Sequence, residues 1–171
     1  THISAATASL VWMIIEWGKH GKPTLGGTAT GCIAGLATIT PASGFVGPAG
    51  ALVIGTMAAI ICYYAVSFVK NTLKIDDTLD VFAVHGVGGL LGTLLLAPLG
   101  STIFGGLGHS EYSILSQLKI QIIASIAVAF WSGVVSFIIL IVIKRFLGIR
   151  VSAEEEEAGL DLSSHSESAY N

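Results

Sequence analysis

The chain has 171 residues, of which 53% are hydrophobic and only 11% charged, and its mean hydropathy is +0.80. A soluble domain of this size carries roughly a quarter of its residues as charges, whereas no Lys, Arg, Asp or Glu occurs from Leu25 to Phe68. This pattern excludes a water-soluble fold and favours the bilayer as solvent. The net charge of −3 comes mostly from the C-terminal end and indicates no nucleic-acid partner.

Five apolar segments can be read as membrane-spanning helices, which need about 20 residues each. In chain order they cover about residues 2–17, 25–40, 49–69, 79–99 and 118–143, and residues 144–171 follow as a tail. The predicted fold class is an all-α integral membrane protein, with a bundle of five transmembrane helices in residues 1–143. The chain opens at Thr1 inside the first segment, without an initiator Met or a charged flank, so we expect a fragment of a longer protein.

The connections between these segments differ in charge. Those after the first, third and fifth segments hold seven of the eight basic residues: Lys19, Lys22, Lys70, Lys74, Lys144, Arg145 and Arg150. These connections must share one side of the membrane, and an excess of Lys and Arg marks the cytoplasmic side. We therefore expect a multi-pass protein of the cell (plasma or inner) membrane with a cytoplasmic C-terminus.

Glycines recur at four-residue intervals in the second and fourth segments. Gly27, Gly31 and Gly35 share one helical face, as do Gly88 and Gly92. Small residues at this spacing let helix backbones approach closely in lipid. The spacing predicts a tightly packed bundle.

His85 lies six residues into the fourth segment, about 9 Å along the helix at 1.5 Å per residue. An ionisable residue at this depth is costly and marks a transport pathway or a proton relay by default; a structural histidine that hydrogen-bonds to a neighbouring helix is the alternative. Because burial disfavours imidazolium, we expect a neutral ring with one donor and one acceptor. Such a ring suits a small neutral polar molecule.

Charged residues cluster at two other places. Asp76, Asp77 and Asp80 precede His85, where aspartates cap a helix start and favour its dipole. The tail combines the acidic run 154–157 with a later mixture of Gly, Leu, Asp, His and Tyr. An acidic run is typical of a disordered end, although this mixture of residue types is unusual for one.

No enzyme is predicted, because Ser43, Cys32 and His85 show no nucleophile–base arrangement that spacing can reveal. Cys32 and Cys62 both lie in apolar segments, where small packing residues are expected rather than a disulfide or a metal site. We expect no cofactor.

Four stretches of this sequence resemble the Amt/Mep/Rh family of ammonium transporters, specifically its Amt branch. They are Gly21-Lys22-Pro23-Thr24-Leu25, the run from Ala34-Gly35-Leu36 to Thr40-Pro41-Ala42-Ser43-Gly44-Phe45, the run Asp76-Asp77 and Asp80-Val81-Phe82-Ala83-Val84-His85-Gly86-Val87-Gly88-Gly89, and the tail from Gly159-Leu160-Asp161 through Ser164-His165-Ser166-Glu167 to Tyr170. They cover essentially the whole chain in family order.

The resemblance implies an eleven-helix transporter whose first ten helices form two inverted halves, with the five segments here resembling helices seven to eleven. It implies that His85 is the second of two hydrogen-bonded pore histidines, that Ile33, Thr40 and Val81 line the pore, and that Asp77 and Asp80 lie at its inner end. The residues of the tail that would have a regulatory role are Arg150, Gly159, Leu160, Asp161, His165, Glu167 and Tyr170.

The implied function is transport of ammonium or ammonia by a homotrimer with one pore per subunit, with a PII-type signal protein as a possible cytoplasmic partner. An ammonium ion in hydrocarbon costs many kcal/mol, whereas neutral ammonia needs only a few hydrogen bonds. Two alternatives stay open: an ammonium sensor of the same fold that signals through the tail, and a proton-coupled transporter of another small solute.

The chain departs from the family pattern in two respects. Ser166 stands where the family usually has Gly, which adopts positive φ without steric cost. The partner histidine, the aromatic gate and the outer recruitment site would lie on helices outside this sequence, so we expect that the chain does not form a complete pore alone.

Overall fold

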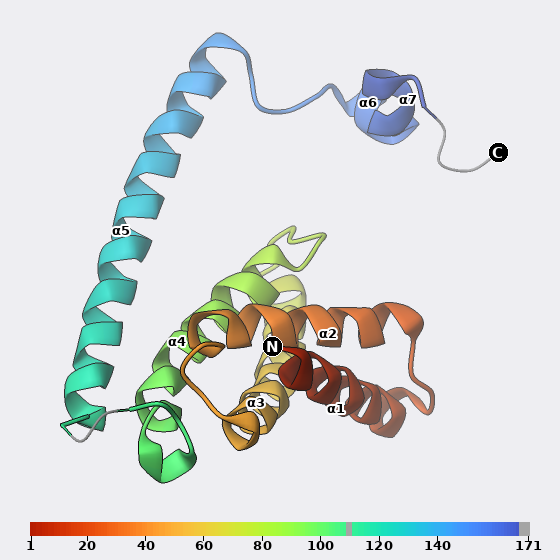
Figure 1. Ribbon diagram of the computed structural model, residues 1–171. Coiled ribbons are helices and arrows are strands. Elements are labelled where there is room, and N and C mark those ends of the chain that lie inside the picture. The colour runs from red at the N-terminus through yellow and green to blue at the C-terminus, as the bar shows by residue number, and fades with distance from the viewer. Residues whose placement is uncertain (109–110, 168–171) are drawn as a thin grey trace. The chain divides into compact units, whose positions relative to one another are not determined.

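The structure, a computed structural model, describes residues 1–108 and 111–167. The chain forms two compact units, Thr1–Ser125 and Ile126–Asn171. Its elements are α1 (His2–His20), α2 (Leu25–Ile39), η1 (Thr40–Ala42), α3 (Pro48–Ser67), η2 (Phe68–Thr72), η3 (Val81–Gly86), α4 (Val87–Leu99), η4 (Thr102–Phe104), α5 (Ile114–Phe146), α6 (Ala153–Ala158) and α7 (Leu160–His165) (Figure 1). No strand occurs among the described residues, and the all-α prediction is confirmed.

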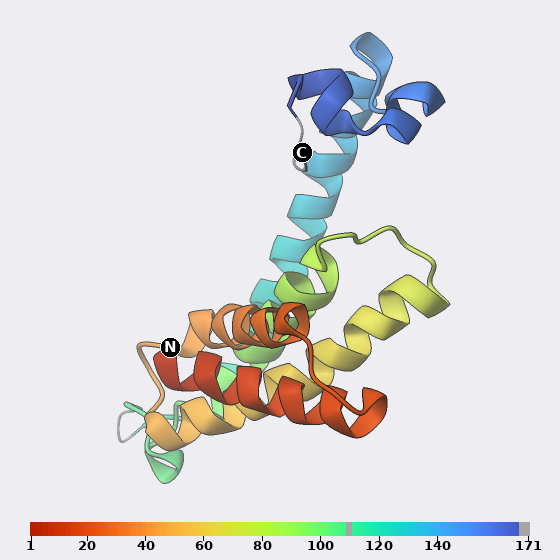
Figure 2. The same cartoon turned by 90° about the vertical axis from the view of Figure 1, so that its right-hand side faces the viewer.

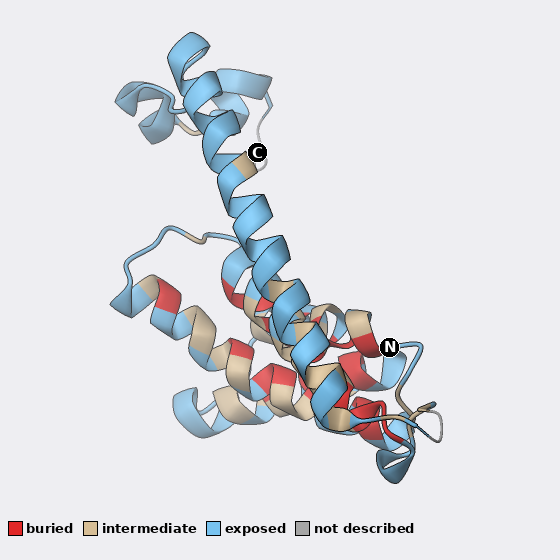
Figure 3. Ribbon diagram, turned by 90° about the vertical axis from the view of Figure 1, so that its left-hand side faces the viewer, coloured by how far each residue is buried: buried red, intermediate tan, exposed pale blue. Residues whose placement is uncertain are grey.

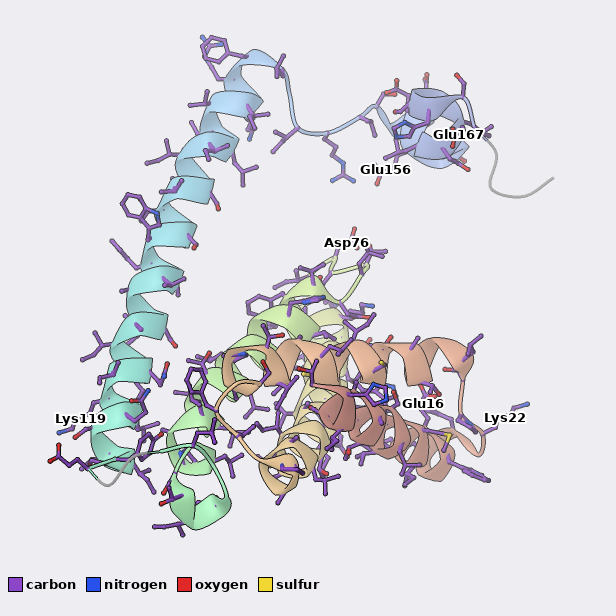
Figure 4. All side chains as sticks on the ribbon, in the orientation of Figure 1. Glu16, Lys22, Asp76, Lys119, Glu156 and Glu167 are labelled. Atoms are coloured by element: carbon purple, nitrogen blue, oxygen red, sulfur yellow. The ribbon has the colours of Figure 1, made fainter. Side chains whose placement is uncertain are left out.

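Both helix ends of the α1–α2 hairpin are capped. α1 ends at Gly21, whose φ of 77° lies in the left-handed region that glycine adopts without steric cost. The Thr24 hydroxyl accepts a hydrogen bond from the Gly27 amide at 2.9 Å. The Glu16 carboxylate of α1 accepts one from the Thr24 amide at 2.7 Å (Figure 4), so a negative charge lies at the positive N-terminus of α2.

The glycine face of α2 packs against α1, which confirms the close approach predicted from the glycine spacing. A Cβ on Gly31 would meet Trp12 Cβ at 2.6 Å, and one on Gly35 would meet the Ser4 carbonyl oxygen at 2.5 Å. The Ser4 hydroxyl donates a hydrogen bond to the Gly35 carbonyl at 2.9 Å. The two helices therefore lie side by side with backbones in contact (Figure 2).

The core of the N-terminal unit lies among α1, α2, α3 and α4 and is built mostly from small residues (Figure 3). One cluster contains Ala8, Trp12, Ala34, Ala59, Cys62 and Val84, and a second contains Ile39, Ala42, Ala51, Ile54 and Leu99. Small side chains increase backbone contact where lipid removes the hydrophobic drive for association. Cys62 packs in the first cluster as a free thiol.

Three helices among the described residues are long and apolar enough to cross a membrane: Pro48–Thr72, Val81–Leu99 and Ile114–Phe146. The sequence predicts five. α2 has 15 residues and is about 22 Å long, short of the roughly 30 Å hydrocarbon core. α1 carries Glu16 and Lys19 in its last turns, and these charges lower its hydropathy.

The tail of the second unit contains two short helices. A capping box starts α6, with the Ser152 amide donating to Glu155 Oε2 at 2.9 Å and the Glu155 amide donating to Ser152 Oγ at 3.2 Å. α7 follows directly after Gly159, whose φ is 92°. Residues 153–158 and 160–165 of the tail are therefore helical, whereas residues 147–152 have no regular structure.

The C-terminal cap of α7 predicts a stabilising substitution. Ser166 has φ 54° and ψ 30°, a left-handed conformation that is costly for residues other than glycine. We expect Ser166→Gly to stabilise α7 by about 0.5–1 kcal/mol, visible as slower amide hydrogen exchange at Ser166 and Glu167, whose amides bond to Leu162 and Asp161. Ser164→Gly, inside the helix, is the control and should destabilise α7 by about 0.5 kcal/mol. Stabilisation by both changes would contradict this account.

The capping box of α6 predicts acid sensitivity. Hydrogen bonds from the Ser152 amide and then from its hydroxyl lower the pKa of Glu155 below its ordinary value of 4.5. A carboxyl whose pKa is lower in the folded state stabilises the helix above its unfolded pKa, and this contribution disappears as pH falls through the folded pKa. We expect α6 to lose helicity across that acidic range, followed by NMR. Glu155→Ala should remove this dependence, and Glu154→Ala should retain it.

Candidate functional site

The candidate site begins where the loop 73–80 enters η3. The Asp77 carboxylate accepts hydrogen bonds from the backbone amides of Val81, Phe82 and Ala83 at 2.8, 3.0 and 3.1 Å. A helix start leaves such amides without intrahelical partners, and aspartate is a preferred cap. Asp77 therefore holds the first turn of the element that carries His85.

An ion pair closes the loop between η2 and η3. Asp80 has φ 56°, and its Oδ1 lies 2.7 Å from Lys70 Nζ. Asp76, in the same loop (Figure 4), accepts a hydrogen bond from the Thr78 hydroxyl at 2.6 Å. Sequence reasoning missed the pairing of Asp80 with Lys70; opposite charges on either side of a short loop are the signal that could have found it.

Both elements beside this loop are π-helical. The Leu73 amide bonds to the Phe68 carbonyl at 3.0 Å, and the Val87 amide bonds to the Phe82 carbonyl, each five residues back. Single π turns inside longer helices are frequent at functional sites. The predicted fourth segment thus contains the π turn η3, whereas η2 extends the predicted third segment beyond residue 69 to residue 72.

The imidazole of His85 is exposed in this chain, which differs from the buried ring expected from its depth in an apolar segment. No hydrogen bond or ion pair holds it within residues 1–108 and 111–167. The alternative interpretation, a structural histidine held by a hydrogen bond to a neighbouring helix, is therefore not observed for His85 among the described residues. The sequence shows how far along the helix His85 lies. Whether its side chain is buried depends on which faces of that helix are covered by neighbouring helices.

The other predicted pathway residues are exposed as well, and they lie on adjoining elements. Val81 is 55% exposed on η3 and Ile33 is 45% exposed on α2, and α2 packs against η3. Thr40 starts η1, and its hydroxyl donates to the Leu36 carbonyl at 2.7 Å. Leu36 continues the exposed stripe between Ile33 and Thr40, and this three-and-four spacing could have identified it from sequence.

The predicted tail residues fall into one helical pair. Arg150 makes a two-pronged salt bridge to Glu156, with both oxygens 3.0 Å from Nη2. Gly159 separates the helices, Leu160, Asp161 and His165 belong to α7, and Glu167 follows the cap (Figure 4 labels Glu156 and Glu167). Tyr170 lies outside the described residues.

These features define a helical membrane protein. In it, η3 is capped by Asp77, carries the exposed His85 and packs against α2. The chain belongs to the Ammonium Transporter Family, whose profile matches residues 1–170. This match confirms the resemblance given by the four sequence stretches.

Known relatives match the chain over its whole length. It is 43% identical over 171 residues to an ammonium transporter of Aquifex aeolicus, covering 100% of this chain and 40% of the relative. It is 44% identical over 170 residues to ammonium transporter Amt1 of Archaeoglobus fulgidus, covering 99% of this chain and 43% of the relative. The chain thus spans about two fifths of the length of these relatives.

Solved structures share the fold. A structure described as a sensor Amt protein has a TM-score of 0.85 and 33% identity, covering 95% of this chain and 40% of that one. Mep2 of Candida albicans has a TM-score of 0.77 and 37% identity, covering 90% of this chain and 36% of that one. The relatives from Aquifex aeolicus and Archaeoglobus fulgidus are both named as ammonium transporters and not as enzymes.

Proposed function

We propose that the whole protein carries ammonium or ammonia across the cell membrane and that this chain contributes one wall of the pathway. The observation behind the proposal is the combination of family membership with the exposed face of α2, η1 and η3. The four positions that the resemblance assigns to the pore, Ile33, Thr40, Val81 and His85, are all exposed on these adjoining elements.

The chemistry of this face supports a neutral cargo. His85 is the only titratable group among these four residues, and the others offer aliphatic surface and one hydroxyl. An apolar wall with sparse hydrogen-bonding groups penalises an ammonium ion far more than ammonia. The remainder of the protein would cover this face and enclose the path.

Several finer assignments belong to the same proposal. α1 and α2 would enter the bilayer with α3, since they pack against it, and the basic connections would place the C-terminus in the cytoplasm. Asp77 and Asp80 would lie at the inner mouth. The whole protein would have eleven transmembrane helices and form a homotrimer without catalytic activity, and its tail would be a regulatory contact for a PII-type protein.

Uptake of labelled methylammonium by cells that carry the full-length protein tests the transport proposal. We expect His85→Ala to lower the uptake rate by about tenfold or more. The Thr40 hydroxyl already donates to the Leu36 carbonyl, so His85 is the residue of these four that can still both donate to and accept from the cargo. His2→Ala, an exposed histidine at the start of α1, is the matched control. Equal uptake by all three proteins, at equal amounts in the membrane, would remove His85 from the pathway.

A sensor is the second candidate, because one structure with the same fold is described as a sensor Amt protein. In that case the protein would bind ammonium and change the state of its tail without moving solute. Ammonium binding without any methylammonium uptake by the unaltered protein would favour the sensor over the transporter.

A further inference from the structure

Two polar side chains of the core lie against the helix that carries His85. Cys62 of α3 and Thr38 of α2 are both fully buried, with 0% exposure. A Cβ on Gly88, near the start of α4, would lie 2.7 Å from Thr38 Oγ1 and 3.3 Å from Cys62 Sγ, so the hydroxyl and the thiol meet at this helix. Because buried polar groups are normally hydrogen-bonded, their partners indicate what they do.

The two groups form a hydrogen-bond chain that ends on the backbone of η3. The Thr38 hydroxyl donates toward the Cys62 thiol, and the thiol donates to the Val84 carbonyl, with sulfur and oxygen 3.9 Å apart. The first link is the weaker one, since no partner meets full hydrogen-bond geometry for Thr38 Oγ1 among the residues that the structure describes. Val84 directly precedes His85, so the chain connects α2 and α3 to the backbone beside the imidazole.

The change of helix type explains why the Val84 carbonyl is available to a thiol. The Val87 amide bonds to the Phe82 carbonyl, five residues back, whereas the amides of an α-helix such as α4 bond four residues back. This change of register leaves one carbonyl near the junction without an amide of its own. The Val84 carbonyl lies at the junction and shares the Val87 amide with Phe82. Cys62 therefore supplies a donor that the helix itself does not.

The π turn determines the direction in which His85 faces. It inserts one residue into the helix, and one residue corresponds to about 100° of rotation at 3.6 residues per turn. If η3 became α-helical, His85 and Val81 would rotate by about this angle relative to α4. A donor that satisfies the spare carbonyl of the π turn therefore holds the imidazole in its exposed direction.

We propose that Cys62 is a positioning residue for His85. Its thiol, supported by the Thr38 hydroxyl, holds the π turn through the Val84 carbonyl and so fixes the direction of the imidazole. The effect on transport rests on the proposed function, whereas the hydrogen bond can be tested without it. Because Cys62 is fully buried and touches no cargo, its loss should lower the maximal rate of uptake more than the apparent affinity for methylammonium.

Solid-state NMR of the full-length protein tests the hydrogen bond directly. Isotope labels at the carbonyl carbon of valine and the amide nitrogen of histidine select Val–His steps, and His85 is the one histidine of this sequence that follows a valine. His85→Ala assigns the signal. We expect Cys62→Ala to move the Val84 carbonyl carbon upfield, because this carbonyl loses a hydrogen bond. Cys32→Ala removes the other thiol and should leave the signal in place. An unmoved Val84 signal in Cys62→Ala overturns the proposal.

Methylammonium uptake at equal amounts of protein in the membrane measures the consequence for transport. We expect Cys62→Ala to lower the maximal rate by about fivefold, the equivalent of one neutral hydrogen bond, and to change KM by less than about twofold. Cys32→Ala should equal the unaltered protein. If His85→Ala lowers uptake but Cys62→Ala does not, the positioning role is refuted and the transport proposal stands. If His85→Ala leaves uptake unchanged, the transport proposal fails, and the NMR comparison still decides whether Cys62 holds the π turn.

Thr38→Val is a second variant that keeps the proposal testable if Cys62→Ala does not fold. Valine keeps the shape of threonine and removes only the hydroxyl, so we expect a smaller upfield movement of the Val84 signal and a loss of about twofold in the maximal rate of uptake. In combination with Cys62→Ala it should have no further effect, because the hydroxyl acts through the thiol. Additive losses of uptake in the double variant would contradict the hydrogen-bond chain.

Discussion

Replacing Asp77 with alanine is expected to destabilise the full-length protein by about 2–4 kcal/mol and to abolish most methylammonium uptake. The carboxylate accepts three backbone amides at the start of η3, and loss of a cap alone costs about 0.5–2 kcal/mol. Hydrogen bonds to a charged group contribute about 1.5–3 kcal/mol each, although water can replace some of them at this exposed end. Thermal unfolding in detergent and uptake at equal expression measure the two effects.

Asparagine at position 77 should have an intermediate effect, because both carboxylate oxygens are used. Oδ1 accepts from Val81, and Oδ2 accepts from Phe82 and Ala83, whereas an Asn side chain has one acceptor oxygen and presents an NH₂ donor in place of the other. Asp76→Ala is the matched control, since among the residues that the structure describes Asp76 accepts only the Thr78 hydroxyl, and it should change stability by no more than about 0.5 kcal/mol. A control as damaging as Asp77→Ala would assign the effect to local charge rather than capping.

Much of the fold can be predicted from local pattern. Apolar runs bounded by Lys, Gly and Pro locate the helices, and glycines at four-residue spacing predict close helix packing without naming the partner helix. The structure shows that α1 is the partner of Gly31 and Gly35. These features depend on neighbours within a few residues or on one helical face. The sequence analysis did not predict the π turns, the Asp77 cap or the Lys70–Asp80 pair beside them; the ion pair joins residues on either side of the loop, beyond the reach of a local helical pattern.

The resemblance predicts the positions of the candidate site residues, and whether they line a pore stays a prediction; the sequence did not predict their environment in this chain. His85, Val81, Ile33 and Thr40 occur on adjoining elements, yet all four are exposed in this chain. Periodicity assigns residues to the faces of a helix, and only the neighbouring helices decide which face is enclosed. For Ser166, by contrast, the sequence did indicate the local environment. The family usually has glycine at this position, which indicates a positive φ, and Ser166 has φ 54°.

The contact between α4 and α2 gives the other large effect, Gly92→Ala. A Cβ on Gly92 would overlap the carbonyl oxygen of Thr38 and would lie 2.7 Å from its carbonyl carbon and 3.1 Å from Pro41 Cγ. Backbone atoms cannot rotate aside as a side chain can, so the helices must separate and the packing of buried Thr38 is lost. We expect destabilisation on the order of 3 kcal/mol or more, measured as loss of folded full-length protein and a lower Tm.

Gly89 provides the matched control for this prediction, because it lies one turn earlier on α4 and a Cβ there would have no neighbour within 4 Å. Gly89→Ala should be neutral or stabilising by up to about 1 kcal/mol, since alanine favours the helix. The difference in Tm between Gly92→Ala and Gly89→Ala measures the effect of the close approach of α4 to α2. Helix propensity does not contribute to this difference, because it would change Tm equally in both variants. Because α4 continues η3 directly, separating it from α2 would also move Val81 and His85 away from Ile33 and Thr40, so uptake should fall with Gly92→Ala even where folded protein remains.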